Sequence, residues 1–313
     1  MARVLSTAFC VALLAATAMA FALTEGAKTE LSPIYQTKIP HVFSPTCNLR
    51  QQGCETNAED IDFTLRKRQN LRVWIEQNGK QVATIVAGKT FPKGPVKLQF
   101  AGLADDGVTI LPDGVYYAVI SLTNEHRVIT LPNKIQLDTT APQVVTFRKQ
   151  IYTHISPDSG HGHDVFREPY TLNMPAHGVL IVNGHQAEFT RRLRLQGTLE
   201  WRGKIDGHLA PPGRYVLYIA AEDAAGNRSK PFPFAVVTIR YVELGRKTIH
   251  VAPLHRFALF VLTDAKDVSW LLDRGHGQSR FHTLRLRAPR KPGRYSLYVT
   301  ASGHTARATV VVG

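Results

Sequence analysis

The stretch from Leu199 to Asn227 limits the possible folds of this 313-residue chain most strongly, because its pattern recurs elsewhere. Trp201 ends a short apolar segment, and a polar loop containing Gly and Pro follows it. The residues at every second position from Tyr215 to Ala221 are apolar, which is the period of a strand that buries one face. We therefore predict a strand, a loop, a second strand and a turn over this stretch.

The same features occur about a hundred residues earlier and in the same order, which indicates an internal repeat. Asn-Gly pairs predict tight hairpins, because both residue types tolerate a positive φ. The final hairpin motif occurs a third time near the C-terminus. The echoing segments are Phe43-Ser44-Pro45 with Ile155-Ser156-Pro157, Asn78-Gly79 with Asn183-Gly184, Leu98-Gln99-Phe100 with Leu199-Glu200-Trp201, Asp113-Gly114-Val115-Tyr116 with Pro212-Gly213-Arg214-Tyr215, and lastly Pro292-Gly293-Arg294-Tyr295.

Short strands separated by turns, with no sustained helical period after the N-terminus, predict an all-β fold of tandem β-sandwiches. We place the first domain at residues 42–142, the second at 143–244 and a smaller third at 245–313. One hydrophobic helix is expected within residues 1–27, followed by an extended tether over 28–41.

The first two domains resemble the bacterial Ig-like domain of the flagellar hook-capping protein, and the resemblance implies tandem Ig-like sandwiches. That family has a Trp-x-Gly-x-Asp-x-x-Gly loop followed by Pro-x-Gly-x-Tyr. The chain as a whole is similar to exported or membrane-anchored proteins of actinobacterial type, and no part resembles the hook-binding segment. The matching residues are Trp201, Gly203, Asp206, Gly207, Pro212, Gly213 and Tyr215, and in the first domain Phe100, Gly102, Asp106, Gly107, Pro112, Gly114 and Tyr116.

The N-terminus has an uncharged run from Val4 to Leu23 that follows Arg3. A bilayer span needs about 20 apolar residues, and this run reaches that length. We favour a signal-anchor, with the N-terminus inside and the bulk of the chain outside the cytoplasm. The alternative is a signal peptide cleaved after Ala20 or Ala22, which would make the protein secreted.

Cys47 and Cys54 lie close together in a polar segment, and Cys10 lies in the apolar run. In an exported chain the first two are expected to form a disulfide, and free thiols are the alternative. Two nearby cysteines do not make a zinc site, which needs four ligands.

The net charge is +14, and the residues from Arg191 onward supply +13 of it, with 21 Lys/Arg and eight Asp/Glu. Such a basic half could bind a cell-wall polymer, an acidic lipid or nucleic acid, although a solvated basic surface is the simpler interpretation. No interleaved aromatic platform is visible, so specific nucleic-acid recognition is not predicted. The residues proposed for an anionic partner are Arg191, Arg192, Arg194, Arg285, Arg287, Arg290, Lys291 and Arg294.

One loop could hold a metal ion, with Asp158, His161, His163 and Asp164 as the candidate ligands. Calcium prefers six to eight oxygen ligands, and the two histidines depart from that set. A transition metal would accept His-x-His with two carboxylates. A Gly-rich polar turn is the favoured interpretation.

No nucleophile elbow, phosphate loop or His-Glu-x-x-His motif occurs, so no enzyme activity and no cofactor are predicted. We expect a structural or interaction protein of the bacterial cell surface, outside the cytoplasm and anchored at the membrane. Its partner would be an envelope protein or polymer. The alternative function is a binding module for an anionic envelope partner, which would use the basic C-terminal half.

Overall fold

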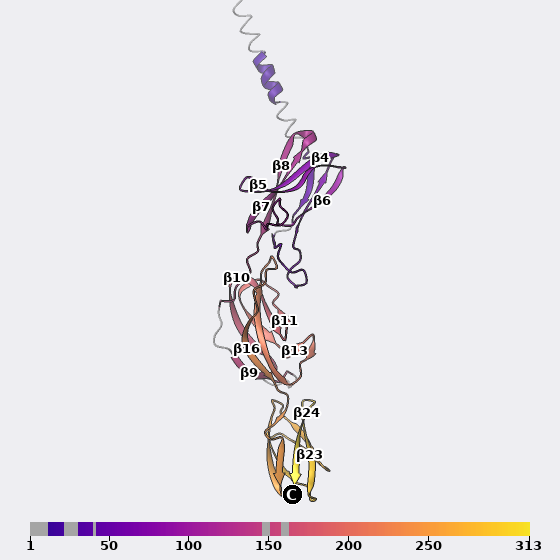
Figure 1. Ribbon diagram of the computed structural model, residues 1–313, viewed down its shortest axis with the longest axis vertical. Helices are drawn as coiled ribbons and strands as arrows, with labels where there is room; N and C mark the ends of the chain where they lie inside the picture. The colour runs from indigo at the N-terminus through magenta and orange to yellow at the C-terminus, as the bar shows by residue number, and fades with distance from the viewer. Residues whose placement is uncertain (1–11, 22–30, 40–41, 146–150, 158–162) are drawn as a thin grey trace, which may run out of the picture. The chain divides into compact units, whose positions relative to one another are not determined.

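The computed structural model describes residues 12–21, 31–39, 42–145, 151–157 and 163–313. Within these ranges there are 24 strands, one short 3-10 helix (η1, Thr123–Glu125) and one helix over residues 12–21. The all-β fold with a single hydrophobic N-terminal helix is confirmed (Figure 1). The chain divides into two compact units, one of Met1–Pro45 and Ala58–Leu137 and the other of Thr46–Asn57 and Asp138–Gly313.

The first unit is a sandwich of two sheets around one apolar core. One sheet has the order β1-β3-β6, and the other has the order β2-β8-β7-β4-β5, in which β2 runs parallel to β8. In immunoglobulin terms these are strands A, B and E facing A′, G, F, C and C′. The strands are β1 (Ile34–Lys38), β2 (Val42–Phe43), β3 (Glu59–Leu65), β4 (Gln69–Gln77), β5 (Lys80–Phe91), β6 (Gly94–Phe100), β7 (Gly114–Leu122) and β8 (Arg127–Leu137).

Alternating burial explains why these segments form strands of a sandwich. In β3, Ile61, Phe63 and Leu65 are buried while the residues between them face outward. The hairpin between β4 and β5 turns at Asn78 and Gly79, with φ values of 52° and 74°, as the sequence predicts. Positive φ at both positions matches the right-handed twist of the two strands.

The second sandwich differs from the first, because its 17-residue strand β10 pairs with strands of both sheets. The first part of β10 pairs with β12, and its second part pairs with β11 and β15. This one strand therefore takes the positions of both strand B and strand C of an Ig-like sandwich. The remaining sheet order is β11-β10-β15-β16-β9, with β9 parallel to β16. The strands are β9 (Ile151–Ile155), β10 (Phe166–Val182), β11 (His185–Phe189), β12 (Arg194–Trp201), β13 (Lys204–Ile205), β14 (His208–Leu209), β15 (Gly213–Glu222) and β16 (Phe232–Ile239).

The third sandwich has the same strand order as the first, although only its final hairpin is visible as a repeat in the sequence. Its sheets are β17-β19-β22 and β18-β24-β23-β20-β21, with β18 parallel to β24. It is therefore a complete sandwich. The strands are β17 (Glu243–Leu244), β18 (Thr248–Val251), β19 (Arg256–Leu262), β20 (Val268–Leu272), β21 (Gly275–Ser279), β22 (Thr283–Arg287), β23 (Gly293–Ala301) and β24 (His304–Val312).

The tyrosine of each repeated hairpin motif forms a tyrosine corner. The Tyr215 hydroxyl donates to the Pro211 carbonyl at 2.8 Å, and the Tyr295 hydroxyl donates to the Lys291 carbonyl at 2.9 Å. Tyr116 bonds to the carbonyl four residues before it in the same way. This bond ties the loop that enters strand F to the core, and it is a hallmark of Ig-like sandwiches.

Two segments differ from the expected organisation. The tether expected over residues 28–41 contains β1, whose Ile34 is buried and pairs with Leu65 of β3. Residues 34–38 of the expected tether are therefore part of the first sandwich. The cysteine segment Thr46–Asn57 lies within the first domain by sequence, yet its contacts belong to the second unit.

The N-terminal helix over residues 12–21 presents its apolar side chains to the outside, including Leu14 and Phe21. Among the residues described, no helix combines the length and the apolar character needed to cross a membrane. The predicted anchor also includes residues 1–11 and 22–27, which lie outside the described ranges.

Candidate functional site

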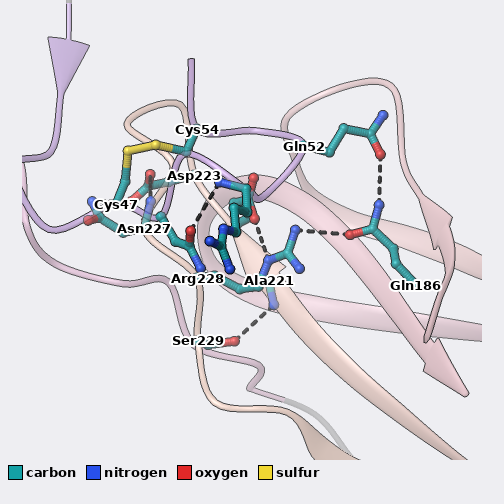
Figure 2. Close-up of polar contacts among 12 residues, drawn as sticks. Cys47, Gln52, Cys54, Gln186, Ala221, Asp223, Asn227, Arg228 and Ser229 are labelled. Atoms are coloured by element: carbon teal, nitrogen blue, oxygen red, sulfur yellow. Dashed lines mark hydrogen bonds and ion pairs between the residues drawn. A yellow bond between two sulfur atoms is a disulfide. The ribbon is translucent and has the colours of Figure 1, made fainter. Parts of the chain in front are cut away.

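Figure 2 shows the most elaborate polar cluster of the second unit, where a disulfide loop lies against the second sandwich. Cys47 and Cys54 are joined, as expected from the sequence, with their Cα atoms 5.8 Å apart. Both are buried. Because both sulfurs are in the bridge, neither is available as a nucleophile or a metal ligand.

The loop packs directly on the turn that connects β15 to β16. Gly226 has a φ of +81°, and a Cβ there would lie 2.8 Å from the Cα of Cys54. A Cβ on Gly53 would overlap the carboxyl group of Glu222. Glycine at both positions is therefore what allows the loop and the turn to approach so closely.

The turn itself is built around the buried side chain of Asp223. Its Oδ1 accepts from the backbone N–H groups of Ala225 at 2.8 Å and Asn227 at 2.9 Å, and its Oδ2 accepts from Asn227 Nδ2 at 3.0 Å. Asn227 Nδ2 also donates to the Asp138 carbonyl at 2.8 Å. Burial raises the pKa of Asp223, while the hydrogen bonds from Asn227 and Ala225 oppose that rise. The Asp-Ala-Ala-Gly-Asn motif is therefore a structural turn.

A chain of polar contacts leads from the turn to the disulfide loop. The buried Glu222 forms an ion pair with Arg228, and Arg228 Nη2 donates to Gln186 Oε1 at 3.0 Å. Gln186 Nε2 in turn donates to Gln52 Oε1 at 2.7 Å (Figure 2). The neighbouring cavity is only about 170 Å³, smaller than a typical ligand site. This cluster fastens the loop and offers little room for a substrate.

The first predicted basic cluster lies on the second sandwich, where β11 is connected to β12. Arg191, Arg192 and Arg194 are exposed and follow β11, at the crossing to β12. They line a hollow of about 250 Å³ together with Tyr170 and Thr190. The structure therefore brings these three residues together, and they have room to contact an anion.

The second cluster is a basic strand on the third sandwich. In β22, Arg285 and Arg287 are exposed while Leu284 and Leu286 are buried, so the two arginines share one face. Register pairing places Arg256 of β19 directly opposite Arg287. Like charges opposite each other destabilise a sheet. Among the described residues, none of the three arginines forms an ion pair, and Arg287 Nε donates to the Leu254 carbonyl at 2.8 Å. We call Arg256, Arg285 and Arg287 the arginine ladder.

The remaining predicted cations lie beyond the arginine ladder in the chain. Arg290 and Lys291 are exposed in the connection after β22, and Arg294 is exposed near the start of β23. Sequence reasoning missed Arg256, because only the pairing of β19 with β22 places it beside Arg287.

A groove of about 600 Å³ lies beside β22 and was not expected from the sequence. Trp270, Phe281 and His282 line it together with residues of β21 and β22. Phe281 is 78% exposed. No local signal in the sequence marks this groove, because residues of separate strands, β20, β21 and β22, come together to line it.

The predicted metal loop is only partly described, and Asp158 and His161 lie outside the described residues. The rings of His154 and His163 are 5.4 Å apart, and burial, assisted by the charge of Arg240, lowers the pKa of His154. Within the described ranges, no group of three or more His, Cys, Asp or Glu side chains could hold a metal ion. The site with His163 and Asp164 remains a prediction.

No family model and no curated protein matches the sequence. Among solved structures, the chain is similar to fibronectin(III)-like modules of Clostridium thermocellum CbhA, with 14% identity and a TM-score of 0.35 over 66% of this chain and 94% of that one. It is also similar to a three-Ig segment of titin, with 9% identity and a TM-score of 0.32 over 90% and 99%. A Bacteroides ovatus SGBP-B structure in complex with a mixed-linkage heptasaccharide matches with 14% identity and a TM-score of 0.20 over 91% and 71%. These scores are low, and it is the strand order of its own sheets that makes this chain a tandem of Ig-like sandwiches.

Proposed function

We propose that this protein is a non-enzymatic structural or interaction protein that works outside the cytoplasm. The observation that carries the proposal is the Cys47–Cys54 bridge, buried against the Asp223–Asn227 turn of a tandem Ig-like chain. Disulfides built into a packed structure are typical of oxidising compartments. The resemblance of the first two domains to the Ig-like domain of the hook-capping protein, and of the whole chain to actinobacterial surface proteins, is part of this proposal. We do not propose a role in flagellar assembly.

In this proposal the N-terminal segment 1–27 holds the chain at the membrane, because the run from Val4 to Leu23 carries no charge and follows Arg3. The test is the N-terminal sequence of the protein isolated from its native cells. A chain that still begins at or near Met1 in the membrane fraction supports anchoring. A mature chain that begins after Ala20 or Ala22 would make the protein secreted.

A second candidate function is the binding of an anionic envelope partner through the third sandwich. The arginine ladder favours it, because these three cations pair with no carboxylate among the described residues and their charge can attract an external anion. Arg191, Arg192 and Arg194 provide a matched comparison, since they contribute the same charge from another sandwich.

The experiment that tests both functions is a pull-down from cell-envelope extract with the full chain at low and moderate salt. Retention of one or a few proteins at moderate salt supports an interaction scaffold. Polyanion capture that salt abolishes supports the anionic partner. Replacing the three ladder arginines by Ser should then weaken retention on heparin more than replacing Arg191, Arg192 and Arg194 by Ser. Equal losses would show that net charge, rather than the arginine ladder, is responsible.

A further inference from the structure

The groove of the third sandwich lies between two strand edges. β21 is the last strand of the five-stranded sheet, and β22 is the last strand of the three-stranded sheet. The volume of about 600 Å³ is within the range of ligand-binding sites in proteins. An edge strand beside a hollow is the geometry that accepts an added strand.

Trp270, one of the residues that line the groove, covers two glycines of β21. Register pairing places Gly277 opposite Trp270 and Gly275 opposite Leu272, which is buried. Paired residues lie on the same face of a sheet, so both glycines face the interior side. A Cβ on Gly277 would lie 3.0 Å from the Trp270 ring. The indole therefore lies over Gly277 and forms part of the groove wall, beside Gln278 and Ser279 of β21.

The backbone of β22 has unpaired groups along this edge. The N–H of Val261 donates to the carbonyl of His282 at 2.7 Å, so these two residues are a hydrogen-bonded pair that continues the register of β19 with β22 by one residue. In an antiparallel ladder such pairs alternate with pairs that are not bonded to each other. Thr283 and Arg285 are therefore non-bonded positions, and their N–H and C=O groups point away from β19 toward the open edge.

The side chains beside this edge specify what an added strand should contain. Leu284 and Leu286 face the interior, where Trp270 and the exposed Phe281 also line the groove. Arg285 and Arg287 face outward. A strand paired with β22 would therefore meet apolar groups on one face and arginine on the other, at every second residue.

The charge of the domain favours an acidic occupant. Residues 245–313 contain 12 Lys/Arg and three Asp/Glu, a net charge of +9. No Asp or Glu is among the residues that line the groove. A peptide with lysine on its outward face would meet the arginine ladder, and like charges across a ladder are destabilising.

We propose that the third sandwich binds an extended segment of a partner protein by strand addition to β22, and that this segment alternates apolar and acidic residues. The apolar side chains enter the groove against Trp270 and Phe281, and the acidic side chains pair with Arg285 and Arg287. The proposal rests on the proposed interaction function and names the chemistry of the partner.

The test uses the full chain in mild detergent and the fluorescein-labelled peptide Glu-Val-Glu-Ile-Glu-Val-Glu, with binding followed by fluorescence anisotropy. A peptide of the same composition, Glu-Glu-Glu-Glu-Val-Val-Ile, has the same charge without the alternation. The alternating peptide should bind at least about tenfold more tightly, the equivalent of about 1.4 kcal/mol. Equal affinities would overturn strand addition. The anionic-partner function is tested separately. It would still be supported if heparin retained the protein in a salt-sensitive way that depends on the arginine ladder.

Thr283→Pro provides the decisive variant, because it removes an N–H that points to the open edge and not one that bonds to β19. Proline is tolerated at such edge positions. We expect it to weaken peptide binding about tenfold while the melting temperature stays within a few degrees. Unchanged affinity in the folded variant would overturn the proposal.

Two further variants, Phe281→Ala and Arg285→Glu, test the proposal if Thr283→Pro does not fold, and Phe232→Ala is the control for the first of them. Phe281→Ala should weaken binding of the alternating peptide, whereas Phe232→Ala, at a half-exposed position of the second sandwich, should not. Arg285→Glu should reverse the charge preference toward the peptide Lys-Val-Lys-Ile-Lys-Val-Lys. If Phe281→Ala and Phe232→Ala have equal effects, or if Arg285→Glu leaves the preference unchanged, the groove is not the binding site.

Discussion

Gly226 and Cys54 are packed backbone against backbone, so closely that a Cβ on Gly226 would lie 2.8 Å from the Cα of Cys54. Real Cβ atoms do not approach other atoms to that distance, so either the loop or the turn would have to move. The contact joins two segments far apart in sequence, and it leaves no room for any side chain larger than a hydrogen atom.

We predict that Gly226→Ala destabilises the second unit by about 2–4 kcal/mol, the sum of a positive-φ cost and of overpacking. Gly184→Ala is the matched control, because Gly184 has the same φ of +81° with no atom within 4 Å. It should cost only about 1–2 kcal/mol. Denaturant unfolding monitored by Trp fluorescence measures both. Equal losses would contradict the close packing of the loop.

Reduction of the disulfide should destabilise the protein by about 2.5 kcal/mol, because it frees a short loop in the unfolded chain. Denaturant unfolding with and without a reducing agent gives this difference. The Cys47→Ala/Cys54→Ala variant should show the reduced stability in both conditions. A wild-type protein whose stability does not respond to reductant, and whose thiol labelling is equal before and after reduction, would exclude the bridge.

The stability of the first sandwich should fall as the pH rises from about 4.5 to 7, because of Glu59. Its side chain is fully buried, and neither carboxyl oxygen has a hydrogen-bond partner within the described structure. Burial, together with the charge of Asp60, raises the pKa of Glu59 to about 7. Over this pH range the unfolded chain releases the proton while the folded chain retains it, so folding becomes less favourable.

The loss attributable to Glu59 is about 3 kcal/mol across that range. Glu59→Gln removes the titrating group, so its stability relative to that of the wild type should rise from pH 4.5 to 7 and then level off. Thermal unfolding of the two proteins at several pH values measures this difference. A constant difference across the range would contradict the raised pKa.

The three tyrosine corners should differ in strength according to their burial. Tyr215→Phe removes a partly buried hydrogen bond to the Pro211 carbonyl and should cost about 1–2 kcal/mol. Tyr295→Phe removes an exposed bond to Lys291 and should cost about 0.5 kcal/mol, since water replaces it. Denaturant unfolding of each variant provides the comparison. If Tyr295→Phe lowered the free energy of unfolding more than Tyr215→Phe, the exposure of the hydrogen bond would not determine its contribution to stability.

Local signals in the sequence predicted much of the fold. The Asn-Gly turns and the tyrosine motifs act over four residues or fewer, so the sequence alone is enough to locate them. Asp106 is a further example, since it accepts from the N–H groups of Val108 and Thr109, as expected of an Asp-Gly turn.

Features that depend on pairing between distant strands were not predictable in the same way. Arg256 joins Arg285 and Arg287 only because of the register of β19 with β22. The cysteine segment could be recognised as a disulfide loop, but nothing local indicates that Cys54 lies against Gly226. The single long strand β10 also has no local signature, because both of its halves show ordinary strand patterns.

In each sandwich the last strand pairs in parallel with a strand near the start of the domain, and this pairing has a mechanical consequence. A force applied between the two ends of one sandwich would act along β9 and β16, or along their counterparts, and would load their hydrogen bonds in shear. Bonds loaded in shear must break together, whereas bonds at the end of a hairpin open one at a time. Five residue pairs join β9 to β16, four join β18 to β24, and two join β2 to β8. Under tension, the first sandwich should therefore yield before the third, and the third before the second.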